Sequence, residues 1–204
     1  MLQVRGLACA RGGVPVLEHL SFEVAAGEAL VIRGPNGVGK TTLLRTLAGL
    51  QPALAGEVVC PEGEGAYASH ADGVKAALTV RENLAFWAEV HGVALPEGIF
   101  ETFDLADLTE RLAGTLSAGQ TRRLGLARLG VIGRKVLFLD EPTVSLDAFS
   151  VKMFARWLTE AHLGAGGCAV IATHIDLGLA ARELDLGPFV ASPEAGGGSD
   201  EAFL

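Results

Sequence analysis

The chain has 204 residues, of which half are hydrophobic and 20% are charged, a composition typical of a folded globular protein. Its net charge of −8 argues against sequence-independent binding to nucleic acid and against direct adhesion to anionic lipid, because both need a basic surface. The three cysteines are far apart and show no metal-ligand spacing, which favours idle thiols in a reducing compartment. No signal peptide and no apolar run of about 18 residues is apparent, so we expect contact with a membrane only through partners.

The first elements alternate between short strands and turns. Gly12-Gly13 is typical of a turn between two short strand-like segments, and residues 20–24 alternate apolar and polar side chains. Residues 29–32 form an apolar run suited to a buried strand. Residues 42–50 have apolar side chains at helical spacing, with Gly49 near the end.

A complete phosphate-binding motif lies between that strand and that helix. Its pattern is G-x-x-x-x-G-K-T, formed by Gly34, Pro35, Asn36, Gly37, Val38, Gly39, Lys40 and Thr41. Such a loop points backbone N–H groups at an anion, and the following helix adds its positive N-terminal end. We expect Lys40 to reach the β- and γ-phosphates of a nucleotide and the Thr41 hydroxyl to bind Mg²⁺.

The rest of the chain predicts a wound α/β domain over 1–204 with one helical insertion. Residues 66–69 are a short strand candidate, and the apolar positions of about 71–128 indicate amphipathic helices. Two apolar runs, 135–139 and 168–172, are typical of central parallel strands. Residues 191–204, rich in glycine, are expected to form a flexible tail.

Two acidic residues end the strand predicted at 135–139. An enzyme with a phosphate loop needs a carboxylate at the tip of a neighbouring strand to hold Mg²⁺, and Asp140 fits that role. Glu141 fits a general base that orients and deprotonates the attacking water. Two solvated acids at a strand end are the alternative, which the nearby phosphate loop disfavours.

A further helix begins near Leu116. Ser117 and Gln120 have the spacing of a capping box, which is a purely structural device. Ala118 and Gly119 between them are small and would leave the helix N-terminus open to a phosphate. The pattern therefore allows both interpretations. On this helix Leu124, Ala127 and Val131 form an apolar stripe, while Arg122 and Arg123 are polar.

These motifs together resemble those of the ATP-binding cassette (ABC) ATPase family over roughly residues 2–180. The resemblance implies a P-loop fold with a small antiparallel β part and a helical subdomain. It implies that the phosphate loop and Thr42 bind ATP, and that Ser117-Ala118-Gly119-Gln120 is the family signature covering the γ-phosphate on a second copy. It also implies that Asp147 couples the two sites of a head-to-tail dimer and that His174 contacts the γ-phosphate.

Two positions depart from the family pattern. His70 stands where the family usually has a glutamine that senses Mg²⁺ and the membrane partner, so metal contact and partner sensing both stay open. Arg11, or a residue near it, replaces the aromatic side chain that stacks on adenine, and a guanidinium can stack on a base.

One branch of the family shares more of the sequence: His70 followed by Gly73-Val74-Lys75, Leu78-Thr79 and Glu82-Asn83-Leu84, residues 116–120 followed by Arg122-Arg123, and the short tail after His174. The pattern is similar to the ATPase subunit of the haem exporter of bacterial cytochrome c maturation. That likeness implies a peripheral protein on the cytoplasmic side of the inner membrane, bound to integral membrane subunits. An ABC exporter with another cargo is the first alternative. A soluble ABC ATPase acting on DNA or ribosomes is the second, disfavoured by the single cassette and the charge of −8.

Overall fold

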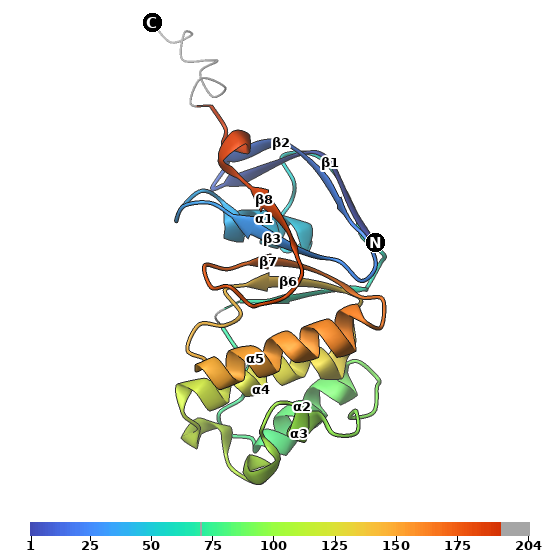
Figure 1. Ribbon diagram of the computed structural model, residues 1–204, viewed down its shortest axis with the longest axis vertical. Helices are drawn as coiled ribbons and strands as arrows, with labels where there is room; N and C mark the ends of the chain where they lie inside the picture. The colour runs from blue at the N-terminus through green and yellow to red at the C-terminus, as the bar shows by residue number, and fades with distance from the viewer. Residues whose placement is uncertain (70, 193–204) are drawn as a thin grey trace, which may run out of the picture.

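The computed structural model describes residues 1–69 and 71–192, so His70 and residues 193–204 of the predicted tail lie outside the described residues. A three-stranded antiparallel sheet opens the fold, with strand order β2-β1-β4 (Figure 1). Its strands are β1 (Leu2–Arg11), β2 (Val14–Val24) and β4 (Ala55–Val59). The first two are longer than the short segments predicted, because register shifts let β1 and β2 stay paired through irregular stretches.

A five-stranded parallel sheet lies beside it, with order β5-β6-β7-β3-β8. Its strands are β3 (Ala29–Arg33), β5 (Gly65–Ala68), β6 (Val136–Asp140), β7 (Cys168–Ala172) and β8 (Arg182–Asp185). The predicted strands at 29–32, 135–139 and 168–172 match β3, β6 and β7 closely. These strands are apolar almost throughout because both faces of the sheet are covered.

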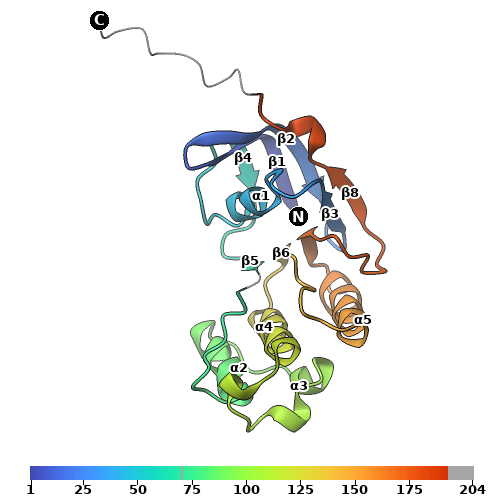
Figure 2. The same ribbon diagram turned by 90° about the vertical axis from the view of Figure 1, so that its left-hand side faces the viewer.

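The helices and helical turns are divided between the two faces of the parallel sheet (Figures 1 and 2). Helix α1 (Lys40–Leu47) contacts β1, β6 and β7, and so lies between the two sheets. The other α-helices are α2 (Val80–Val90), α3 (Ile99–Thr102), α4 (Ala118–Ile132) and α5 (Ala148–Trp157), which continues into a π-helical turn, η3 (Leu158–Leu163). Short 3₁₀ turns are η1 (Ala106–Leu108), η2 (Ala113–Thr115) and η4 (Gly187–Phe189).

Alternation along the parallel strands builds two hydrophobic cores. On β6, Leu137 and Leu139 belong to the core shared with α2, α4 and α5. Val136 and Phe138 point the other way, into the core shared with α1 and the antiparallel sheet. A strand with both faces buried fixes its register strongly, since a shift of one residue would exchange the two sets.

The architecture confirms the expected fold: an α/β P-loop core, a small antiparallel part, and helices inserted between β5 and β6. Among the described residues, no helix combines the length and hydropathy needed to cross a membrane.

Candidate nucleotide-binding and hydrolytic site

The phosphate loop connects β3 to α1. Gly34, Gly37 and Gly39 all have positive φ, at 143°, 85° and 117°. At Gly39 a Cβ atom would also lie 3.0 Å from the Leu17 side chain, so a larger residue would strain the backbone and force Leu17 to shift. Helix α1 begins at the next residue without a side-chain cap. The first N–H groups of α1 are therefore left for an anion held by the loop.

Lys40 folds back across this loop. Its side chain is largely buried, and Nζ donates hydrogen bonds to the carbonyl oxygens of Gly34 at 2.7 Å and Pro35 at 3.2 Å. An ammonium group carries three donors, and the third polar atom within reach of Nζ is His174 Nε2 at 3.4 Å, a contact that a phosphate oxygen would take over. The hydroxyl-bearing side chain of Thr41 is exposed, one residue further along α1.

Asp140 ends β6 and is buried, with 8% of its surface exposed. The Tyr67 hydroxyl, from β5, donates a hydrogen bond to Asp140 Oδ2 at 3.2 Å. Burial and the Asp140 carboxylate raise the pKa of Tyr67 to about 12. A protonated Tyr67 thus orients the carboxylate, a role that sequence reasoning missed because it depends on the pairing of β5 with β6.

Tyr67 is the only tyrosine of the chain, so its ionisation can be followed directly by absorbance. At pH 11 an ordinary tyrosine is roughly 90% ionised, whereas one with a pKa of about 12 is roughly 10% ionised. We therefore expect little tyrosinate signal at pH 11 in the folded protein. In Asp140→Asn the transition should move to lower pH, since the neighbouring charge is removed.

Full tyrosinate absorbance at pH 11 in the folded wild-type chain would contradict the contact between Tyr67 and Asp140.

The raised pKa of Tyr67 also predicts how the stability of the fold depends on pH. The unfolded chain loses the tyrosine proton near pH 10 and the folded chain near pH 12, so stability from Tyr67 is present below pH 10 and is lost between about pH 10 and 12.

Four of the predicted site residues come together where β3, β6 and β7 end. His174, after β7, places Nε2 3.0 Å from Asn36 Oδ1 in the phosphate loop and 3.4 Å from Lys40 Nζ. The same nitrogen lies 3.5 Å from Glu141 Oε1. The side chains of His174 and Glu141 are 54% and 27% exposed. The phosphate loop, the Glu141 carboxylate and the His174 imidazole thus lie together at one solvent-accessible point.

The predicted signature begins α4 and forms a complete capping box. Ser117 Oγ accepts from the Gln120 N–H at 3.3 Å, and Gln120 Oε1 accepts from the Ser117 N–H at 2.9 Å. Ser117 and Ala118 are exposed. A Cβ atom at Gly119 would lie 3.2 Å from the Ser145 carbonyl oxygen, so the helix start packs on the loop before α5. Among the described residues, no hydrogen bond joins this motif to the phosphate loop of the same chain.

Asp147 caps α5, with Oδ1 accepting from the Ser150 N–H at 2.8 Å. That hydrogen bond is the main reason why the pKa of Asp147 is lowered.

The side chain of Arg11, at the end of β1, reaches the N-terminal turn of α1, where Nη2 donates to Thr42 Oγ1 at 3.5 Å. Arg11 is exposed beside the phosphate loop, and Thr42 is buried.

Arg122 is a second residue near the site whose position the sequence analysis did not predict. The sequence shows it only as a polar residue of the helix, but it is buried, with 3% exposure. Its spacing offered a signal: Leu126 and Leu129 follow at i+4 and i+7 and are buried, so Arg122 lies on an apolar side of α4.

The donors around the loop suit a nucleotide with a magnesium ion. The described residues contain no group of three His, Cys, Asp or Glu side chains that would enclose a metal by themselves. Mg²⁺ in nucleotide sites takes few protein ligands and keeps phosphate oxygens and waters. One exposed hydroxyl, on Thr41, and one buried carboxylate, on Asp140, are a fitting donor set.

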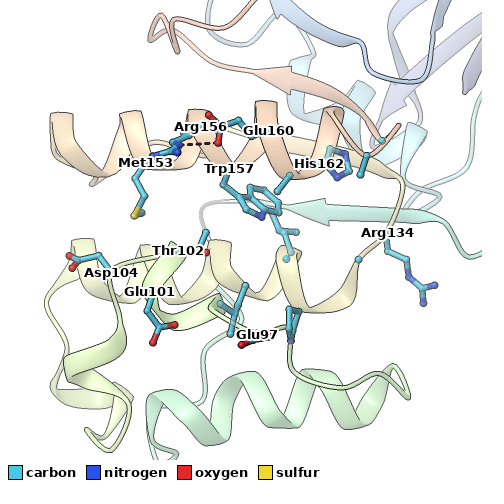
Figure 3. A pocket seen from close by; sticks show the side chains of 18 of the residues that line it. Glu97, Glu101, Thr102, Asp104, Arg134, Met153, Arg156, Trp157, Glu160 and His162 are labelled. Atoms are coloured by element: carbon cyan, nitrogen blue, oxygen red, sulfur yellow. Dashed lines mark hydrogen bonds and ion pairs between the residues drawn. The ribbon is translucent and has the colours of Figure 1, made fainter.

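A large hollow lies elsewhere, away from the phosphate loop. It has a volume of about 1080 Å³ and opens between α5 and the segment containing α3 (Figure 3). Met153, Arg156 and Trp157 line one side, and Glu101 and Thr102 lie across from them. None of the predicted site residues lines it, so we do not connect it with nucleotide chemistry.

Comparison with known proteins defines the class. Residues 17–144 match the family described as ABC transporter, and the chain belongs to this family. The fold is similar to a solved structure described as a putative ABC transporter ATP-binding protein from Pyrococcus furiosus. That likeness has a TM-score of 0.81 at 25% identity and covers 93% of this chain and 99% of the other. The protein is therefore an ABC-type ATPase that binds ATP.

The curated relatives are more specific. The chain is 61% identical, over 100% of its length and 99% of the relative, to a "Cytochrome c biogenesis ATP-binding export protein CcmA" of Roseobacter denitrificans. A protein of the same description from Rhodobacter capsulatus is also 61% identical, covering 100% of this chain and 95% of the relative.

Proposed function

We propose that the chain is the ATP-hydrolysing subunit of an ABC complex in bacterial cytochrome c biogenesis, and that it powers haem export or release of a haem-loaded chaperone. The observation that carries this is the convergence of Lys40, Glu141 and His174 on the phosphate loop, in a chain 61% identical over its full length to proteins named for that process. The haem cargo rests on the sequence resemblance alone.

The residues of the cluster have distinct tasks in hydrolysis. The N–H groups of the loop and the third donor of Lys40 hold the phosphates and stabilise charge that develops on the leaving group. Glu141 orients the attacking water and accepts its proton. His174 donates toward the γ-phosphate, and its contact with Asn36 keeps the imidazole over the loop.

Thr41 and Asp140 would hold the magnesium ion, Asp140 directly or through water. When bound, the ion would supply positive charge that neutralises the charge on the phosphates. Tyr67 fixes the orientation of the Asp140 carboxylate. His70, which we predicted as a further metal or partner contact, is outside the described residues. Arg11 stacks on the base, and its position beside the first turn of α1 supports this.

A second copy of the chain completes each site. Ser117 and Ala118 are exposed at the start of α4, and the capping box leaves the Ser117 hydroxyl proton free to donate. In a head-to-tail dimer these residues would cover the γ-phosphate held by the partner. Asp147, on the loop that packs against Gly119, would couple the two sites. The dimer would bind integral membrane subunits and so lie at the cytoplasmic face of the inner membrane.

Affinity purification of the chain from detergent-solubilised membranes, followed by mass spectrometry, tests the assignment. We expect integral subunits of the cytochrome c maturation system in the eluate. Other integral membrane subunits would keep the transporter ATPase and reject the haem cargo. Recovery with ribosomes or DNA-bound proteins would reject transport altogether. The matched control is the same purification from cells that carry the tag on an unrelated soluble protein.

A further inference from the structure

Arg122 joins the start of the signature helix to the backbone of the proposed catalytic base. We infer that Arg122 is a positioning residue for hydrolysis, which holds Glu141 in its active conformation and ties it to the chain that follows β5. The inference rests on the proposed role of Glu141 as the base.

The guanidinium donates four hydrogen bonds to two other segments of the chain. Nη2 donates to the Glu141 carbonyl oxygen at 2.9 Å, and Nε donates to that of Pro142 at 2.8 Å. Nη1 donates to the Ser69 carbonyl oxygen at 2.6 Å and to Asp72 Oδ1 at 2.7 Å. All three nitrogens are thus in use. A planar fork of this shape is specific to arginine and cannot be reproduced by lysine.

The backbone of Glu141 needs such a restraint. Its φ is +49°, in the left-handed region that residues other than glycine rarely adopt. Such a conformation persists only where the surroundings hold it. The Glu141 N–H donates to the Ala172 carbonyl oxygen at 2.8 Å, and Arg122 holds the carbonyl at the other end of the residue. Arg122 is therefore half of the clamp that sets the direction of the Glu141 side chain.

The other half of the guanidinium anchors the chain beyond β5. The ion pair between Arg122 and Asp72 is largely buried, with side-chain exposures of 4% and 18%. Asp72 approaches α4 closely because Gly125 has no side chain, and a Cβ atom there would lie 2.7 Å from the Asp72 Cβ. A displacement of Ser69 or Asp72 would therefore move the rigid Arg122 guanidinium and, through it, the backbone of Glu141.

Kinetics of the purified full-length chain separate this role from simple stabilisation. We expect Arg122→Gln to lower kcat by about tenfold to a hundredfold, the range of effects from misplacing a reacting group by about 1 Å. The KM for ATP should stay nearly unchanged, because the phosphate loop is untouched. Arg122→Lys should recover part of the loss. Arg123→Gln, the control on the same helix, removes an ion pair with Asp104 and should leave kcat unchanged.

The decisive measurement is a double-mutant cycle with Glu141→Gln, read as single-turnover hydrolysis of radiolabelled ATP. If Arg122 acts through Glu141, then Arg122→Lys should cause no further loss in the Glu141→Gln background. Equal losses in both backgrounds, or normal kcat in Arg122→Lys, would overturn the inference. If Arg122→Gln does not fold, the lysine variant alone decides. Normal turnover in Glu141→Gln would instead reject the proposed base.

Discussion

Glu141→Gln is expected to lower ATP turnover by orders of magnitude while leaving ATP binding intact. The amide has the shape of the carboxylate but cannot accept a proton from water, and general-base catalysis contributes about 10²–10⁴-fold to rate. The neutral side chain also removes a negative charge close to the γ-phosphate, so the ATP-bound state should persist. With ATP and Mg²⁺ the variant should accumulate as a nucleotide-bound dimer. Phosphate release and light scattering after size-exclusion chromatography measure the two effects.

The matched control is Glu110→Gln, which makes the same chemical change at an exposed ion pair with Arg81. It should turn over ATP like the wild-type chain, because exposed pairs contribute little. Wild-type turnover in Glu141→Gln would remove Glu141 from the role of base. Loss of ATP binding would show that the carboxylate supports the loop rather than the reaction.

Lys40→Met is expected to lose ATP binding itself. Methionine fills the buried stem but has no ammonium to meet phosphate, and a hydrogen bond to a charged group contributes about 1.5–3 kcal/mol. The carbonyl oxygens of Gly34 and Pro35 also lose their donor and would repel an incoming anion. We therefore expect ATP affinity to fall by about a hundredfold or more, measured by fluorescence titration with a nucleotide analogue.

Arg45→Met provides the comparison, since it removes one exposed positive charge from the same helix. That variant should bind ATP normally. If both variants lost affinity equally, the effect would be one of general electrostatics. Unchanged affinity in Lys40→Met alone would exclude Lys40 from the phosphate site.

The parts of the site that could be predicted are local in sequence. The phosphate loop, the acidic end of β6 and the capping box at Ser117 are each encoded within a few neighbouring residues, and strand and helix flanks confirm their context. What sequence could not show depends on long-range packing. Tyr67 meets Asp140 only because β5 pairs with β6. The burial of Arg122 depends on three carbonyl oxygens and the Asp72 carboxylate, all distant from it in the sequence.

For the fold, too, the sequence predicted elements with a regular local pattern and missed features that depend on long-range packing. The apolar runs of β3, β6 and β7 identified central strands, since strands buried on both faces need nothing else. The length of β1 and β2 was underestimated, because their polar positions and register shifts interrupt a regular pattern. From the sequence, Arg122 is identified only as polar and its burial is not predicted, although the leucines at i+4 and i+7 indicate an apolar side of the helix.

The strand order has a consequence for how the chain can vary. The phosphate loop, His174 and Glu141 follow β3, β7 and β6, which are adjacent in that order. Neighbouring strands lie about 4.8 Å apart, so the spacing between binding loop and catalytic groups is a property of the sheet rather than of any loop. Helices α2 and α3, inserted after β5, carry none of the residues placed at the site. Their lengths and surfaces can therefore change without altering the spacing between the binding loop and the catalytic groups.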